Sequence, residues 1–230
     1  MTLMIAKFAA AIIVGYLLGS IPFGLLLSRR YAKVDVTKYG SGKTGATNVL
    51  RTAGRKSAIL VVALDLAKGM LAVIFAGLIV GKGYLVVNGV GLGALVAEVL
   101  AALAAIAGHN WSVFLKFRGG RGVATFFGGL IALCPPAAIF GGEIIIIGAG
   151  LTRYVSLGSI AGAVGSYAVL VPLTIMNGFP LEYLFYALVG TIIIFVMHRD
   201  NIARLIAGKE RKLGEKAKRR GSSGHTGGAG

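Results

Sequence analysis

The chain has 230 residues, of which 56% are hydrophobic, and its mean hydropathy is +0.82. So apolar a composition excludes an ordinary soluble domain of this length and indicates a polytopic membrane protein. The formal net charge of +16 would also suit a nucleic-acid-binding protein, but the cations lie between apolar segments, so orientation in a bilayer explains them and nucleic acid is not expected as a partner.

Hydrophobic stretches predict an all-α membrane protein with about seven transmembrane helices, at 4–27, 58–80, 84–107, 123–133, 137–151, 160–176 and 181–197. A Gly-Ser-Ile-Pro sequence at 19–22 is expected to bend the first span. The fourth stretch is too short to cross a bilayer unaided, so we expect it beside a thinned or water-filled region. The single cysteine, Cys134, follows that stretch and excludes an internal disulfide and a cysteine-based metal cluster, and no metal site is predicted.

Basic residues fall on alternate connections between these stretches. One side holds nearly all of the 24 Lys and Arg residues, in the connections 28–57, 108–122, 152–156 and 198–230. The opposite side holds only Lys7 and Lys82. The positive-inside rule therefore predicts an N-terminus outside, a C-terminus in the cytoplasm, and glycine-rich loops that face the cytoplasm. We expect a membrane domain over 1–208 and a flexible cytoplasmic tail over 209–230, basic at first and then rich in Gly and Ser.

The connection at 108–125 (GHNWSVFLKFRGGRGVAT) has the composition of an anion-binding site. Three cations, Lys116, Arg118 and Arg121, flank the pair Gly119–Gly120. Glycine lets backbone N–H groups approach an anion closely, and the side chains neutralise its charge. The helix expected just after this loop would add the positive end of its dipole. We therefore expect the chain to handle phosphate at a membrane surface.

An earlier basic loop, 40–45 (GSGKTG), matches the dinucleotide pattern G-x-G-x-x-G and resembles the end of a Walker A loop. Neither identification holds, because no buried strand precedes the loop and Thr37 stands where a Walker A loop needs glycine. The loop and the residues after it still carry many short donors suited to an oxyanion: Ser41, Thr44, Thr47, Asn48 and Arg51. A flexible interfacial loop that only orients the protein is an equal alternative from these residues alone.

Two familiar signatures of acyl transfer are absent. His109 and His198 lack the Asp at the fifth position that orients a His base in soluble-type glycerolipid acyltransferases, and no G-x-S-x-G nucleophile elbow occurs. A lone histidine at a span boundary is more often a hydrogen-bonded interfacial residue than a catalyst. His198, however, stands beside Arg199 and Asn201 on the cationic side, which favours a role in the site.

Ionisable residues also fall within the apolar stretches. Asp65 and Lys68 are three residues apart, so they can pair on one helix face, and their cost in lipid predicts that they face the bundle interior. A structural pair is at least as good an interpretation as a chemical role. The positions of Glu98 and Glu143 suggest no role.

Five segments in chain order resemble the motifs of the bacterial acyl-phosphate:glycerol-3-phosphate acyltransferase family: 40–51 (GSGKTGATNVLR), 64–69 (LDLAKG), 108–125, 153–159 (RYVSLGS) and 198–201 (HRDN). The resemblance extends over most of the chain, from residue 18 to residue 208. Two positions depart from the family pattern: Arg121 stands where Lys is common, and HRDN replaces HREN. The first could change how tightly a phosphate is held, because Arg binds it as a planar fork and Lys as a point charge.

The resemblance implies an integral membrane enzyme of the bacterial cytoplasmic (inner) membrane, with its active site facing the cytoplasm. It would transfer a fatty acyl group from acyl phosphate to the 1-hydroxyl of glycerol 3-phosphate, giving lysophosphatidate and inorganic phosphate, the first step of phospholipid synthesis. Acyl phosphate is a mixed anhydride with a good leaving group, so positioning and charge neutralisation would carry the catalysis. We expect a monomer in contact with membrane lipid, without cofactor or metal.

The same resemblance assigns the site residues. The acyl phosphate would be held by Ser41, Thr47, Asn48 and backbone N–H groups of the loop that includes Gly40 and Gly42. Glycerol 3-phosphate would be held by Arg51, Arg118, Ser156, His198 and Asn201. Supporting contacts to either phosphate would come from Gly119, Gly120, Arg121 and Lys68. The residues expected to be catalytic are Ser41, Arg51, Arg118, His198 and Asn201. The acyl chain would lie in a groove between helices that is open to lipid.

A transporter or channel for organic phosphates is the alternative function. Cationic loops, broken helices and a glycine-rich bundle would suit it as well. The one-sided distribution of cations and the lack of a visible inverted repeat count against it. Acyl-chain preference does not follow from the sequence, nor does the choice between Arg118 and Arg121 as the direct phosphate ligand.

Overall fold

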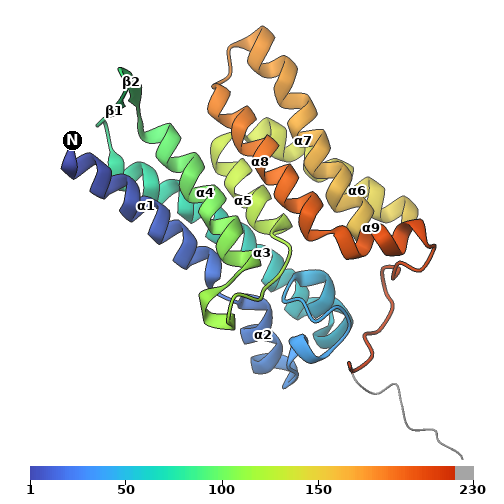
Figure 1. Cartoon of the computed structure of the whole chain (residues 1–230). Helices are drawn as coiled ribbons and strands as arrows, with labels where there is room; N and C mark the ends of the chain where they lie inside the picture. Colours follow the sequence, from blue (N-terminus) through green and yellow to red (C-terminus); the bar gives the residue numbers. More distant parts are fainter. Residues whose placement is uncertain (221–230) are drawn as a thin grey trace, which may run out of the picture.

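The structure is a computed structural model that describes residues 1–220 (Figure 1). Nearly all of its regular structure is helical: α1 (Thr2–Ser20), α2 (Phe23–Ala32), α3 (Ala46–Val80), α4 (Ala94–Asn110), α5 (Val123–Leu133), α6 (Pro135–Thr152), α7 (Val155–Asn177), α8 (Leu181–Met197) and α9 (Arg199–Ile206). An antiparallel hairpin pairs β1 (Leu85–Val87) with β2 (Val90–Leu92). Two 3-10 turns, η1 (Val36–Lys38) and η2 (Val113–Leu115), lie in loops. The predicted all-α class is confirmed, and 221–230 of the predicted tail lies outside the described residues.

The helices support a multi-pass membrane protein. Within residues 1–220, four stretches are long and apolar enough to cross a membrane: Thr2–Ala32, Ala46–Val80, Pro135–Thr152 and Val155–Asn177. The pair α8 and α9, bent by 60°, would make a fifth, whereas α4 and α5 are apolar but shorter. The seven predicted helical stretches correspond to the bent pair α1–α2 and to α3 through α8. Seven complete spans and their orientation stay predictions.

Local chemistry explains where the helices begin and end. The expected bend in the first span lies between Ser20, the last residue of α1, and Pro22, the N-cap of α2. The stretch expected to be helical from residue 84 instead begins with the β1–β2 hairpin. Its turn residues Asn88 and Gly89 both have positive φ, as a two-residue hairpin turn requires, and β-branched valines flank it. Helix α4 therefore starts only at Ala94.

Helix α3 extends further into the basic connection than predicted. It begins at Ala46 and contains a break at Gly54, where φ is 86° and ψ is 176°. Val49, in the segment before the break, is fully buried, so this part has an apolar face to pack. Because of the break, the part of α3 before Gly54 packs in the loop region, while the part after Gly54 packs in the membrane bundle.

Small residues bring α1 and α4 close together. A Cβ placed on Gly15 would lie 2.4 Å from the backbone oxygen of Ala101, and one on Gly19 would lie 2.1 Å from that of Ala105. Only glycine permits such an approach, which is typical of small-xxx-small packing in membranes. Helix α4 is thereby held against the bend at the end of α1 (Figure 1).

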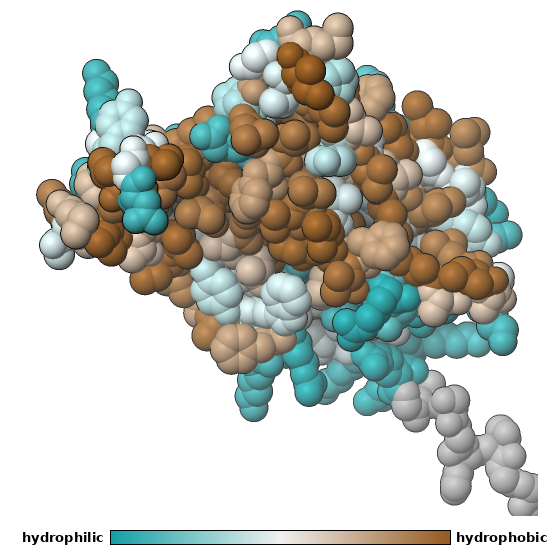
Figure 2. Space-filling view, turned by 45° about the horizontal axis from the view of Figure 1, so that its top comes forward, coloured by the Kyte–Doolittle hydropathy of each residue, from teal (hydrophilic) through white to brown (hydrophobic). Residues whose placement is uncertain are grey.

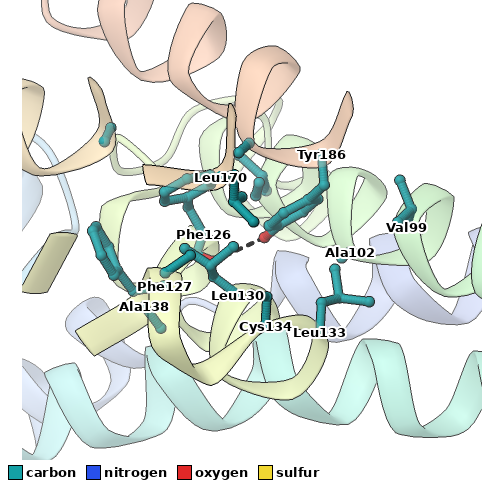
Figure 3. Close-up of a cluster of buried hydrophobic side chains, with 14 of the residues drawn as sticks. Val99, Ala102, Phe126, Phe127, Leu130, Leu133, Cys134, Ala138, Leu170 and Tyr186 are labelled. Atoms are coloured by element: carbon teal, nitrogen blue, oxygen red, sulfur yellow. Dashed lines mark hydrogen bonds between the residues drawn. The ribbon is translucent and has the colours of Figure 1, made fainter. Parts of the chain in front are cut away.

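The largest apolar core fixes α5 in the centre of the bundle (Figure 3). Tyr186 of α8 is fully buried, and its Oη donates to the backbone oxygen of Phe126 at 2.8 Å. The two rings stack at 5.4 Å, while Phe127 meets Phe126 edge-on at 5.2 Å. Because the bonded oxygen lies in the first turn of α5, this contact positions the start of that helix.

The surface divides by polarity. Figure 2 shows hydrophobic side chains over most of one face and hydrophilic side chains gathered along its lower edge. Leu78, Ile146 and Ile175 are each more than 70% exposed. Apolar residues this exposed indicate contact with lipid rather than water.

Candidate active site

A cavity of about 420 Å³ is lined by residues of α3, α5, α6 and α7. Its polar wall, here named the charged end, comes from helix starts and connections: Ser41, Lys43, Thr47, Asn48, Arg51, Arg121, Ser156, His198, Asn201 and Glu210. Its apolar end comes from helix interiors: Val62, Leu66, Phe127, Ile131, Ala138, Gly142, Ile145 and Ile146. Since a helix rises about 1.5 Å per residue, Ile131 lies about 13 Å beyond Gly122, which starts α5. The cavity thus joins a charged region to an apolar interior.

Three helices begin at the charged end. Their first residues, Ala46 of α3, Val123 of α5 and Val155 of α7, all line the cavity. Glycines cap α3 and α5, and within the described residues none of the three N-cap side chains bonds to the first N–H groups of its helix. The positive ends of three helix dipoles therefore converge on this end, which favours an anion.

Asn48 organises the loop between η1 and α3. Its Nδ2 lies 3.1 Å from the backbone oxygens of Val36 and Tyr39 and 2.9 Å from that of Lys43, and donates to them. Its Oδ1 accepts from the backbone N–H of Ser41 at 3.3 Å. Both ends of the buried amide are thus used within the loop, so Asn48 positions Ser41 at the cavity.

Two arginines reach the charged end from different elements. Arg51 of α3 donates through Nη2 to the backbone oxygens of Arg211 and Lys212, at 3.1 and 3.2 Å. Arg121 lies on the connection 111–122 between α4 and α5, here named the glycine loop. Burial lowers the pKa of Arg121 to about 10, although the nearby Glu210 carboxylate opposes the decrease. The buried Nε atoms of Arg51 and Arg121 have no hydrogen-bond partner among residues 1–220. Buried cationic donors of this kind suit an anionic ligand.

Lys43 and His198 complete the basic lining. Burial lowers the pKa of Lys43, and the positive charge of Arg121 lowers it further. His198 ends α8 and is 2% exposed, with Nδ1 2.8 Å from the backbone oxygen of Ile194. That nitrogen must donate to the carbonyl, which leaves Nε2 as the ring atom available to a ligand.

Glu210 is the acidic member of the charged end. Its Oε1 accepts from Asn201 Nδ2 at 2.6 Å and from Ser156 Oγ at 3.2 Å, and its Oε2 accepts from Arg204 Nε at 2.7 Å. These bonds tie the start of α7 to α9. They also orient Asn201, whose buried Oδ1 has no partner within the described chain.

The segment 209–220 runs back along the site. Its Leu213 N–H donates to the backbone oxygen of Arg153 at 2.7 Å, and its Ala217 N–H donates to that of Arg51 at 3.2 Å. Near its end, Lys218 accepts from the N–H of Gly40 at 3.0 Å. The basic part of the predicted tail therefore contacts the loop between η1 and α3, here named the first loop. It also contacts helix α3 and the connection that leads into α7.

The structure brings together most of the residues predicted for the site. The cavity is lined by Ser41, Thr47, Asn48, Arg51, Arg121, Ser156, His198 and Asn201. These residues come from the first loop, the glycine loop, α7 and the α8–α9 connection, which are far apart in sequence. Gly40 and Gly42 do not line the cavity, but their positive φ values of 54° and 70° shape the loop that carries Ser41.

Besides Gly40 and Gly42, four predicted residues lie away from the cavity wall. Arg118 is exposed and forms an isolated antiparallel bridge with Ser112. Gly119 and Gly120 belong to the glycine loop and are buried. Lys68 Nζ pairs with Asp65 at 2.8 Å and donates to the backbone oxygen of Ile21 at 3.2 Å, beside the α1–α2 bend.

Four ionisable residues that line the cavity were not among the predicted site residues: Lys43, Asp65, His109 and Glu210. Lys43 lies inside a motif already selected, so its charge could have marked it. Glu210 is an acid within a strongly basic segment, which is a usable signal. Asp65 and His109 reach the cavity only because α3 and α4 pack together, and no local pattern predicts that.

Comparison with known proteins identifies the family. The model of a family described as glycerol-3-phosphate acyltransferase matches residues 9–208. The chain is 64% identical over 216 residues to glycerol-3-phosphate acyltransferase 3 of Dehalococcoides mccartyi, covering 94% of this chain and 100% of that protein. It is 43% identical over 209 residues to the glycerol-3-phosphate acyltransferase of Thermus thermophilus, covering 91% and 96%.

Solved structures agree with this result. The crystal structure of PlsY (YgiH), an integral membrane glycerol 3-phosphate acyltransferase, in its glycerol 3-phosphate form has a TM-score of 0.77 and 35% sequence identity, covering 90% of this chain and 96% of that one. Its lysophosphatidic acid form has a TM-score of 0.76 and 34% identity, covering 90% and 95%. The resemblance inferred from five motifs is confirmed. The chain belongs to the glycerol-3-phosphate acyltransferase family of integral membrane enzymes.

Proposed function

We propose that the protein transfers a fatty acyl group from acyl phosphate to the 1-hydroxyl of glycerol 3-phosphate, giving lysophosphatidate and inorganic phosphate. The observation that carries this proposal is the cavity, whose charged end suits phosphates and whose apolar end suits an acyl chain. The glycerol 3-phosphate and lysophosphatidic acid forms of the PlsY crystal structure support it. The reaction would begin bacterial phospholipid synthesis.

The donor is already activated, so the protein need not form a covalent intermediate. The 1-hydroxyl oxygen bonds to the acyl carbon, the bond from that carbon to the phosphate oxygen breaks, and the hydroxyl proton passes to a substrate phosphate. Cationic and N–H donors fixed beforehand stabilise the charge that shifts onto the leaving phosphate. Holding both substrates in one cavity removes the entropic cost of their encounter from the chemical step.

We assign the acyl phosphate to the first loop, through Ser41, Thr47 and the N–H groups that begin α3. The side chain of Asn48 acts on this substrate through the loop that it holds. We assign glycerol 3-phosphate to Arg51, Ser156, His198 and Asn201. The unpartnered Nε of Arg51 and the free ring nitrogen of His198 support that assignment.

Arg121 is the better candidate than Arg118 for direct contact with a phosphate. Arg121 lines the cavity and is half-buried, whereas Arg118 is exposed outside it. Arg118 then acts from the surface, where it attracts anionic substrates over a longer range. Lys43 adds a second cation at the same wall.

We propose that the protein is a monomer in the bacterial inner membrane with the charged end facing the cytoplasm. The N-terminus would lie outside, and seven helical segments would form the membrane domain over 1–208, followed by the cytoplasmic tail. The one-sided distribution of Lys and Arg supports this orientation. Phosphorylated substrates occur on that side.

The test compares acyl phosphate and acyl-coenzyme A as donors for purified protein with glycerol 3-phosphate, in the presence of a metal chelator. We expect lysophosphatidate and inorganic phosphate from acyl phosphate alone. Product formed only from acyl-coenzyme A would show that the donor is wrongly assigned. Uptake of labelled glycerol phosphate into proteoliposomes without any product would instead support the transporter.

A further inference from the structure

Three titratable side chains are buried together behind the glycine loop. Asp65 and Lys68 belong to α3, His109 belongs to α4, and they are 2%, 3% and 6% exposed. Lys68 Nζ lies 2.8 Å and His109 Nδ1 lies 3.5 Å from the same carboxylate oxygen of Asp65. We name these residues the Asp65–Lys68–His109 cluster. Burying three such groups is costly, so their retention points to a function beyond stability.

The cluster holds the glycine loop through His109. The backbone oxygen of His109 accepts from the N–H of Gly120 at 3.0 Å. The imidazole packs so closely on the same residue that a Cβ on Gly120 would lie 1.9 Å from His109 Nε2. A Cβ on Gly119 would lie 2.1 Å from the backbone oxygen of His109. The next residue, Arg121, lines the charged end of the cavity.

The far side of the cluster is anchored to α1 and α2. Lys68 Nζ donates to the backbone oxygen of Ile21 at 3.2 Å, between these two helices. Lys68 lines a small crevice at that bend, while Asp65 and His109 line both the crevice and the large cavity. Through these contacts, the cluster links the glycine loop to α3, to α4 and to the bend between α1 and α2.

We propose that Asp65, Lys68 and His109 are positioning residues for glycerol 3-phosphate binding. Asp65, itself held by Lys68, orients the imidazole of His109. The imidazole supports the backbone at Gly120, and the position of Gly120 places the Arg121 guanidinium, on the next residue, at the charged end. The ring has Nδ1 beside Asp65 and Nε2 against Gly120, so it acts on the loop and not on a reacting atom. This inference rests on the proposed function.

The first test measures steady-state kinetics of Asp65→Asn and His109→Ala with each substrate varied in turn. We expect the KM for glycerol 3-phosphate to rise about tenfold or more, because small displacements of a binding group have effects of this size. The KM for acyl phosphate should stay within about twofold of wild type. His109→Gln, which keeps a polar group near the position of Nε2, should recover part of the loss. An equal rise in both KM values, or no rise in either, would overturn the proposal.

A matched pair of double variants separates positioning from a general loss of packing. Gly120→Ala introduces a methyl group against the His109 ring, so adding His109→Ala should relieve part of its defect. Gly119→Ala introduces one against the His109 backbone oxygen, so the same second substitution should give no relief. Relief of both glycine variants, or of neither, would contradict a specific contact between the ring and Gly120.

Binding measurements distinguish failure of the inference from failure of the proposed function. Titration calorimetry with inorganic phosphate and with glycerol 3-phosphate is done on wild type and on the two cluster variants, after thermal unfolding in detergent has verified that each is folded. If wild type makes no lysophosphatidate, the proposed reaction is wrong, yet weaker binding in the variants still supports the cluster's role. If folded variants bind both anions as wild type does, the positioning role is wrong whatever the reaction.

Discussion

Arg118 and Arg121 are three residues apart, yet they lie on different sides of the glycine loop. Lys116 and Phe117 have φ values of 52° and 58°, so the chain reverses direction just before Arg118. Arg118 forms a bridge with Ser112 and stays exposed at the surface, whereas Arg121 lines the cavity. The spacing of basic residues in the sequence does not reveal a backbone reversal of this kind.

Replacing each arginine by alanine should therefore give unequal losses. We expect Arg121→Ala to lower kcat/KM for glycerol 3-phosphate about 100-fold, because it removes a charge-assisted hydrogen bond in a buried site. Arg118→Ala should lower kcat/KM much less, and its activity should depend less on salt than that of wild type, because salt screens the long-range attraction that the substitution removes. Initial rates at varied glycerol 3-phosphate concentration and ionic strength measure both effects. Equal losses from the two substitutions would show that the cavity wall is wrongly assigned.

Lys43 should set the alkaline limit of activity. Burial, with the charge of Arg121, lowers its pKa below the ordinary lysine value. A base with a lowered pKa loses its positive charge as pH rises through that lower value, and phosphate binding weakens there. We expect Lys43→Arg to move the alkaline decline of kcat/KM to higher pH, since arginine keeps its charge. A pH–rate profile that is identical in wild type and variant would refute this role.

At the level of elements, α3 links the membrane bundle to the site. Its first residues line the charged end, its break at Gly54 separates that part from the bundle, and Asp65 and Lys68 belong to its next segment. Close contact with α5 fixes the two helices in register, because a Cβ on Gly69 would lie 2.2 Å from the backbone oxygen of Thr125. Since the glycine loop ends where α5 begins, this contact also positions Arg121.

Gly69→Ala should accordingly destabilise the protein. Its methyl group meets backbone atoms of α5, and overpacking of this kind costs about 1–3 kcal/mol. Thermal unfolding in detergent should show a lower midpoint, together with reduced activity. Gly150→Ala in α6 is the control, because no atom lies within 4 Å of a Cβ built there. Similar midpoints for the two variants would mean that α3 and α5 can separate without cost.

At the scale of the whole molecule, the distribution of charge supports the proposed orientation in the membrane. The charged end gathers loops that carry most of the cations. The β1–β2 hairpin lies at the other end of the bundle (Figure 1), and Lys82 belongs to the short connection between α3 and β1. Exposed apolar residues between them form the surface for lipid. The asymmetry that we propose orients the protein also places the groups proposed to bind phosphate on one side.

Cysteine labelling tests that orientation. The single native cysteine, Cys134, is buried and can be replaced by alanine to give a background without thiols. In that background we expect Lys82→Cys to react with a membrane-impermeant maleimide in intact cells. Lys38→Cys should react only after the cells are opened. Labelling of both sites in intact cells, or the reverse order, would contradict the proposed topology.

The sequence alone determined the class, the helical segments and the family motifs. Hydropathy predicts buried or lipid-facing helices, since every backbone group in a bilayer must bond internally. It did not predict the hairpin at 85–92, where a two-residue turn overrides an apolar pattern, nor the start of α3 at Ala46. Helix ends depend on local turn geometry, which hydropathy does not contain.

Tertiary structure decided which of the candidate residues share a cavity. Ser41, Arg121 and Asn201 come together only because helices pack at glycine contacts and loops fold over their ends. The same packing brought in Asp65 and His109 from helix interiors and Glu210 from the predicted tail, and left Arg118 outside. Residue type and spacing state what a side chain can do, but the direction in which it points is set by contacts between segments distant in the chain.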